Sequence, residues 1–171
     1  YGNPYVPGSS LKGMFRTIFL ADRLINHSND YTIQREQFKE KAFEIKPKKQ
    51  RYLSRNIQDM EAKTFRTLHR PNTRGDDAVN DIMAGFIVSD SEPLSVEDLT
   101  LAQKVDVHVK KGAKNLPSVR ECLKPGTDIV FTITIDTSIC PYTKQDIIES
   151  ITTSMTIIIS TLLNHSLQLS T

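Results

Sequence analysis

The residues best suited to chemistry in this sequence lie near its start, in the run Gly8, Ser9, Ser10 and Lys12 that leads to Arg16. A glycine turn that enters a helix directs unpaired backbone N–H groups and the positive end of the helix dipole at one place, which suits a phosphate group. The two serine hydroxyls add hydrogen-bond donors, and the two basic side chains add positive charge one turn apart. The run therefore predicts a phosphate-binding turn, and a well-capped helix start without a ligand is the alternative that remains open.

The spacing of Gly8 and Gly13 matches the two glycines of a P-loop, G-x-x-x-x-G. A P-loop continues with Lys and then Ser or Thr, which reach the terminal phosphates and magnesium, but Met14 and Phe15 stand at those positions. We therefore do not expect hydrolysis of nucleoside triphosphates. Because Gly13 costs about 1 kcal/mol relative to Ala inside a helix, we expect the close approach of another backbone to explain it.

A basic insertion is predicted around residues 27–55. Between Arg35 and Arg55, eight Lys or Arg residues face three Glu residues, although the formal net charge of the whole chain is only +2. Phe38, Phe43 and Tyr52 are interleaved with this charge. The pattern fits binding to a nucleic-acid backbone with stacking on bases, and a solvated surface insertion is the alternative.

A second basic stretch begins at Lys104 and ends at Lys124. Lys110 and Lys111 open the sequence Lys-Lys-Gly-Ala-Lys, which predicts a loop tip between two elements. We expect Lys104, Lys110 and Lys111 to contact phosphates. An ordinary surface loop is again the alternative.

Signals for catalysis or metal binding are weak, so we expect no enzyme activity and no cofactor. The four histidines are scattered and form no ligand set, and Cys122 and Cys140 are interpreted as buried apolar residues. Acidic side chains that would hold magnesium in a nuclease occur in two groups, although turn and capping roles explain them at least as well. These groups are Asp76, Asp77 and Asp81, and Asp90 with Glu92.

Four helices are predicted to position these residues. The first begins near Ser9 or Ser10 and buries a face spaced for a helix. The second covers 57–68 with Asn56 as its cap, and a short one follows Asp76 and stops at Gly85. The last begins at Thr143, where Asp146 completes a capping box. The expected buried positions are Leu11, Met14, Phe15, Ile18, Ala21 and Ile25 in the first helix, and Ile148, Ile151, Met155, Ile158 and Leu162 in the last.

Three strands are predicted, over 85–88, 101–109 and 128–136. The third alternates most clearly, with Ile129 and Phe131 directed inward and Val130 and Thr132 outward. Helices and strands follow one another without a regular βαβα pattern. The predicted fold class is therefore α+β.

Composition describes a water-soluble globular domain. The chain has 171 residues, 38% hydrophobic and 25% charged, which argues against a disordered tail, a collagen-like fibre or a membrane protein. The most apolar stretch, 155–163, is shorter than the roughly 20 residues that span a bilayer. Two cysteines are too few for a disulfide scaffold and favour a reducing compartment. We expect a piece of a larger cytoplasmic protein without membrane contact.

Several segments together resemble one family. The run from Tyr5 to Gly13, Tyr-Val-Pro-Gly-Ser-Ser-Leu-Lys-Gly, followed by Arg16, resembles the signature of the RAMP superfamily of CRISPR RNA-binding proteins. Three later segments, 77–81, 88–93 and 116–127, narrow the resemblance to the fifth-subunit family of type III-A CRISPR effector complexes, the Csm complexes.

The resemblance implies a modified ferredoxin-like (RRM-like) fold with insertions, forming a single RAMP-type domain over residues 1–171 that is incomplete at both ends. The family's N-terminal strand and glycine-rich C-terminal motif would lie outside this sequence, so we expect that the piece does not fold alone. By this likeness Gly8, Ser9, Ser10, Lys12 and Arg16 would face RNA.

The resemblance also implies a non-catalytic role in antiviral defence. The protein would cap its complex at the crRNA 3′ end and support crRNA maturation through recruited host nucleases. Its partners would be crRNA, target RNA in the assembled complex, and other effector subunits. Two alternatives are a related backbone subunit that cleaves target RNA with a loop aspartate and magnesium, and a cap that binds only protein.

Overall fold

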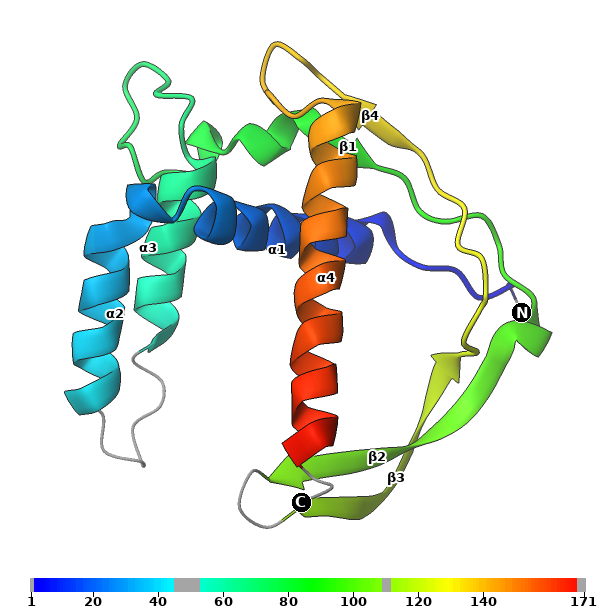
Figure 1. Cartoon of the computed structure of the whole chain (residues 1–171). Coiled ribbons are helices and arrows are strands. Elements are labelled where there is room, and N and C mark those ends of the chain that lie inside the picture. The colour runs from blue at the N-terminus through cyan, green and yellow to red at the C-terminus, as the bar shows by residue number, and fades with distance from the viewer. Residues whose placement is uncertain (1, 45–52, 109–111, 169–171) are drawn as a thin grey trace. The chain divides into compact units, whose positions relative to one another are not determined.

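The computed structural model of the chain describes residues 2–44, 53–108 and 112–168 (Figure 1). These residues divide into two compact units. The smaller unit joins residues 1–10 to 88–132, and the larger joins 11–87 to 133–171. The expectation of one RAMP-type domain over the whole chain stays a prediction.

The elements mix helices and short sheets, which confirms the α+β class. Strand β1 pairs with β4, and β2 pairs with β3. Short 3-10 turns connect the longer elements, including two over 78–85 where one short helix was predicted. The longer elements are α1 (Gly8–Asn26), α2 (Thr32–Glu44), α3 (Leu53–Phe65), β1 (Phe86–Val88), β2 (Leu99–His108), β3 (Gly112–Leu123), β4 (Ile133–Ile135) and α4 (Lys144–Gln168).

An aromatic cluster forms the core of the larger unit. The ring of Phe19 stacks on Tyr142 with centroids 4.2 Å apart and meets Phe86 edge-on at 5.4 Å. Helix α1 reaches this cluster through Leu11, Phe15 and Phe19, which are buried at a spacing of four residues. The predicted face of α1 is therefore partly wrong, because its expected members Met14 and Ile25 are exposed.

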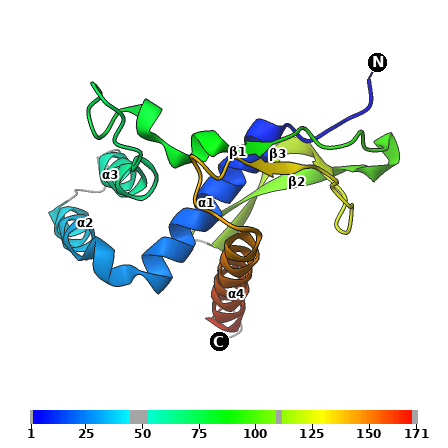
Figure 2. The same cartoon turned by 90° about the horizontal axis from the view of Figure 1, so that it is seen from above.

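Helices α2 and α3 lie side by side, and Figure 2 shows both nearly end-on. The buried hydroxyls of Tyr31 and Thr64 join the turn before α2 to α3 at 2.8 Å. The predicted cap at Asn56 is wrong, because α3 begins at Leu53 and Asn56 is buried inside the helix. Residues 45–52 of the basic insertion lie outside the described residues.

Residues 89–94 are the middle of three extended segments in the smaller unit. On one side Leu94 N–H donates to Pro4 C=O at 2.8 Å, and on the other Glu92 N–H donates to Val130 C=O at 2.8 Å. The alternation predicted for residues 128–136 is confirmed, because its odd positions from 129 to 135 are less exposed than the even ones. The strand itself is shorter than predicted, since β4 begins at Ile133.

Strands β2 and β3 form an antiparallel ribbon with an irregularity between Gln103 and Val105. The strand predicted over 101–109 is confirmed, whereas β3 was not predicted, and the predicted loop tip is shorter because β3 begins at Gly112. Apolar side chains of the ribbon are open to solvent within this unit, with Leu101 71% and Val107 74% exposed.

Helix α4 begins with the predicted capping box. Thr143 N–H donates to Asp146 Oδ2 at 2.7 Å, and Asp146 N–H donates back to Thr143 Oγ1 at 3.2 Å. The predicted buried face is wrong at Ile148 and Met155, which are exposed, whereas Ile147, Ser150 and Ser154 are buried. The side chains of its other members Ile158 and Leu162 lie outside the described residues. Ser154 is small enough to lie near α1, with its Oγ 3.5 Å from the carbonyl oxygen of Ile18. Among the described residues, no helix is both long and apolar enough to cross a bilayer.

The capping box predicts a pH-dependent loss in a Thr143→Ala variant. Hydrogen bonds from Thr143 lower the pKa of Asp146 below its usual value. Because the pKa of Asp146 is lower in the folded state, its carboxylate stabilises the fold fully at pH values above the unfolded-state pKa. This contribution to the free energy of unfolding is lost as the pH falls through the folded-state pKa. We expect a loss of about 1 kcal/mol at neutral pH that shrinks in acid, measured by urea unfolding. Thr137→Ala, in an exposed turn, is the control, and a pH-independent loss would contradict the assignment.

Candidate nucleic-acid interface

Gly8 lies at the first position of α1 and is buried against the backbone of residues 88–89. A Cβ atom at this position would overlap the carbonyl oxygen of Val88 and would stand 2.6 Å from that of Ser89. Neither carbonyl is the flexible end of a side chain, so only glycine fits. The contact joins the start of α1 to the segment that follows β1.

Two amides at the start of α1 have partners within the chain. Gly8 N–H donates to Asp90 Oδ1 at 2.7 Å, and Ser10 N–H donates to the carbonyl of Pro7 at 3.0 Å. The carboxylate of Asp90 thus occupies the position at the helix N-terminus where a phosphate was expected, for the same electrostatic reason. What remains open to a ligand here is the pair of exposed side chains of Ser9 and Ser10.

Arg16, one turn after Lys12 on α1, has charged and aromatic partners within the chain. Arg16 donates to Asp81 Oδ2 at 2.8 Å and lies 3.6 Å from a carboxylate oxygen of Glu61. Its guanidinium also covers the ring of Phe65 at 4.2 Å, and its side chain is only 25% exposed. The geometry gives Arg16 a positioning role for α1, and contact between Arg16 and RNA stays a prediction.

Gly13 has open space where a side chain would be. No heavy atom lies within 4 Å of a Cβ built at this position. The expected close approach of another backbone is therefore absent from the described residues, and that explanation of Gly13 is wrong for the chain by itself. Ser9, Gly13 and Thr17 follow one another along an exposed side of α1, which leaves a low surface beside Lys12.

Of the three lysines that we expect to contact phosphates, only Lys104 lies among the described residues, on the ribbon of β2 and β3. Lys104 lies on β2 and forms an ion pair with Asp106 at 3.5 Å. Lys110 and Lys111 lie outside the described residues. Phosphate contact by these three lysines stays a prediction.

Three of the acidic residues considered for magnesium, Asp77, Asp81 and Asp90, accept hydrogen bonds from backbone amides. Asp77 accepts from the amide of Arg74 at 2.9 Å, and Asp81 accepts from the amide of Met83 at 2.8 Å. Asp90 holds Gly8, as described above. No group of three or more His, Cys, Asp or Glu side chains within the described ranges can hold a metal ion. The turn and capping interpretation of these aspartates is confirmed.

The two cysteines have different surroundings. Cys140 is buried as predicted, whereas the expectation for Cys122 is wrong because it is exposed on β3. Burial raises the pKa of the Cys140 thiol above its usual value. A raised pKa lowers the thiolate fraction, which is the opposite of what a nucleophile needs.

Comparisons with known proteins agree on one family. The model of the RAMP superfamily matches residues 1–149. The CRISPR system Cms protein Csm5 of Mycobacterium tuberculosis (strain H37Rv) is 38% identical over 144 residues, which are 80% of this chain and 34% of that protein. Csm5 of Streptococcus thermophilus is 36% identical over 138 residues, 80% of this chain and 32% of that protein. This chain thus spans about a third of the length of these curated relatives.

A solved structure is also similar. The crystal structure of T. onnurineus Csm5 superposes with a TM-score of 0.52 at 27% identity, covering 81% of this chain and 40% of that one. This likeness supports the modified ferredoxin-like fold that the family resemblance implied.

The two glycines of α1 predict opposite effects of alanine. Gly8→Ala forces the backbone of residues 88–89 to shift, and we expect a loss of about 2 kcal/mol in the free energy of unfolding. The methyl group of Gly13→Ala meets no other atom, and alanine lowers the conformational entropy of the unfolded chain. We therefore expect a gain of up to about 1 kcal/mol in the free energy of unfolding. Urea unfolding of both variants measures the difference. Equal effects at the two positions would contradict the packing described here.

Arg16 and Asp81 predict a coupled pair. Arg16→Ala leaves the partly buried carboxylate of Asp81 without its cationic partner, and we expect a loss of about 2 kcal/mol in the free energy of unfolding. Asp81→Asn keeps an oxygen for the Met83 amide but removes the charge. The double variant is expected to lose about 1 kcal/mol less than the sum of the single losses. Arg35→Ala, on exposed α2, is the control, and strict additivity would overturn the pairing.

Proposed function

Since the chain belongs to the RAMP superfamily, we propose that it binds guide RNA as a non-catalytic subunit of a type III-A CRISPR effector complex. Similarity to Csm5 over 80% of the chain supports the choice of complex. Because the chain spans about a third of those relatives, their partners and role come to it as part of this proposal.

The start of α1 carries the proposal. Ser9 and Ser10 present exposed hydroxyls, and Lys12 adds a charge one turn further along the helix. These groups donate to phosphate oxygens, while Gly8 and Asp90 hold the turn in place. The low surface at Gly13 gives a ribose-phosphate chain room to approach. Since phosphate contacts carry no base information, binding is independent of sequence.

Further phosphate contacts come from the basic ribbon. Lys104 stands on β2, and Lys110 and Lys111 follow in the sequence. Their charges extend the contact along the guide RNA by counterion release. For Lys110 and Lys111 this rests on the sequence alone.

The remaining parts of the proposal rest on the resemblance to the fifth-subunit family. The protein caps the complex at the crRNA 3′ end, contacts neighbouring subunits and bound target RNA, and supports crRNA maturation through recruited nucleases in the cytoplasm. The structural uses of Asp77, Asp81 and Asp90 support a role without catalysis.

The salt dependence of RNA binding tests the site. We expect Lys12→Ala to weaken binding of a single-stranded guide-RNA oligonucleotide and to reduce the slope of log affinity against log salt by about 0.7. Ser9→Ala with Ser10→Ala is expected to weaken binding with little change in slope, because the hydroxyls carry no charge. Fluorescence anisotropy at several salt concentrations measures both quantities. Lys144→Ala, an exposed lysine in the first turn of α4, is the matched control.

Two outcomes would contradict the proposal. An unchanged slope in Lys12→Ala, equal to that of the control, would remove the start of α1 from the interface and favour a cap that binds only protein. Regular cleavage of target RNA that disappears in Asp76→Asn, Asp77→Asn or Asp90→Asn would favour the catalytic backbone subunit.

A further inference from the structure

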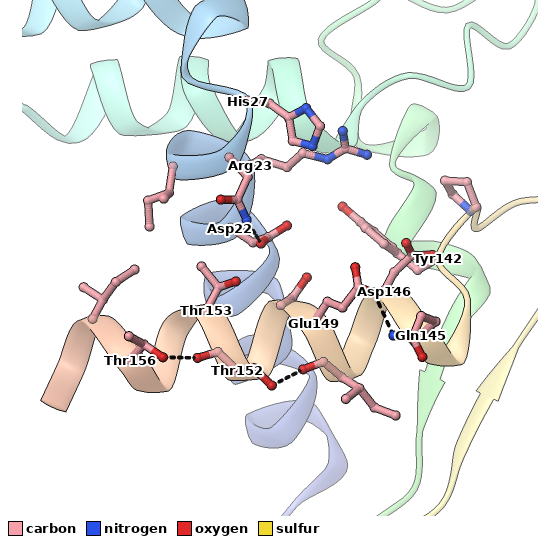
Figure 3. A pocket seen from close by; sticks show the side chains of 16 residues that line it. Asp22, Arg23, His27, Tyr142, Gln145, Asp146, Glu149, Thr152, Thr153 and Thr156 are labelled. Carbon is pink, nitrogen blue, oxygen red and sulfur yellow. Dashed lines mark hydrogen bonds between the residues drawn. The ribbon is translucent and has the colours of Figure 1, made fainter. Parts of the chain in front are cut away.

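A groove of about 1020 Å³ lies between the second half of α1 and the first half of α4, within the larger unit (Figure 3). Figure 3 shows Asp22 of α1 on the side that faces α4, from which Glu149 and Thr153 point back, whereas the side chain of Arg23 runs beside His27. The groove shares no residue with the proposed RNA contacts at positions 8–16 and 104–111. Its chemistry is also different.

The groove is acidic in a chain of net positive charge. Asp22, Asp146 and Glu149 line it, and Arg23 is the cation among the described lining residues. Asp22 accepts from the neutral amide of Asn26 at 2.7 Å, and Glu149 accepts from that of Gln145 at 2.7 Å. These neutral partners leave both charges uncompensated. The groove therefore carries a formal charge of −2, against +2 for the whole chain.

Apolar side chains accompany this charge. Ile25 of α1 and Ile148 of α4 line the groove and are 46% and 47% exposed. Sequence periodicity assigned both to buried faces, yet the two helices contact each other through other positions. Exposed apolar groups beside carboxylates whose hydrogen-bond partners are neutral complement a segment that has both apolar and basic side chains. A nucleic-acid backbone, which is polyanionic, is repelled by the same charges.

We propose that this groove binds a basic, amphipathic segment of a partner protein. Apolar side chains of the segment cover Ile25 and Ile148, and its Lys or Arg side chains pair with Asp22 and Glu149. Asp146 adds to the negative electrostatic potential of the groove, but its carboxylate is held by the hydrogen bonds of the capping box. The inference does not depend on the RNA-binding proposal, because the two surfaces use different residues.

A designed peptide pair tests the groove. The probe is a short amphipathic peptide of Leu, Ala and Lys, and its counterpart carries Glu at every Lys position. We expect the full chain to bind the basic peptide in a salt-dependent manner and to bind the acidic one far more weakly, by fluorescence anisotropy. Glu149→Gln is expected to weaken binding of the basic peptide about fivefold. Glu97→Gln, an exposed carboxylate that does not line the groove, is expected to have no effect.

Further variants separate the contributions. Ile148→Ser replaces an exposed side chain, so the fold is retained, and we expect weaker binding with an unchanged salt slope. Lys12→Ala is expected to leave peptide binding unchanged even where it alters RNA binding. Equal binding of the two peptides would overturn the proposal, and so would identical effects of Glu149→Gln and Glu97→Gln. The groove would instead be an RNA site if an RNA displaced the basic peptide and if Glu149→Gln weakened binding of that RNA.

Discussion

Gly8 lies against the carbonyl oxygens of residues 88–89 with no room for a side chain, and this contact packs the first residue of α1 against the segment that follows β1. The carboxylate of Asp90 fixes the amide of the same residue. Because the turn is held by its own chain, the backbone that carries Ser9 and Ser10 is held in one position. Such preorganisation reduces the entropy that a ligand must offset on binding.

Charge is distributed unevenly over the larger unit, where Lys12 and Arg16 of α1 lie outside the acidic groove between α1 and α4. Arg16 is neutralised by Asp81 and Glu61, so its charge stabilises the fold and contributes little to the field outside. Lys12 has no ion-pair partner among the described residues. The groove bordered by Asp22 and Glu149 has the opposite sign. If both proposals hold, a polyanion and a basic polypeptide bind different surfaces, because Lys12 and the groove carry opposite charge.

Local patterns predicted local structure well. The start of α1, the capping box at Asp146 and the alternation before β4 depend on neighbours within a few residues. The buried face of α4 did not follow from hydrophobicity, because the small polar residues Ser150 and Ser154 are buried and Ser154 lies near α1. The pairing of Arg16 with Asp81 spans 65 residues, and no local pattern contains it. The sequence thus named the residues of the candidate RNA site, whose contact with RNA stays a prediction, but it could not show that the charge of Arg16 is paired within the chain.

The most direct measurement of the central claim is the structure of the assembled effector complex with bound guide RNA. The account predicts phosphate oxygens about 3 Å from the hydroxyls of Ser9 or Ser10 and from the ammonium of Lys12. If these side chains are instead covered by another polypeptide, with no nucleotide in contact, the start of α1 is not the RNA interface and the account is contradicted.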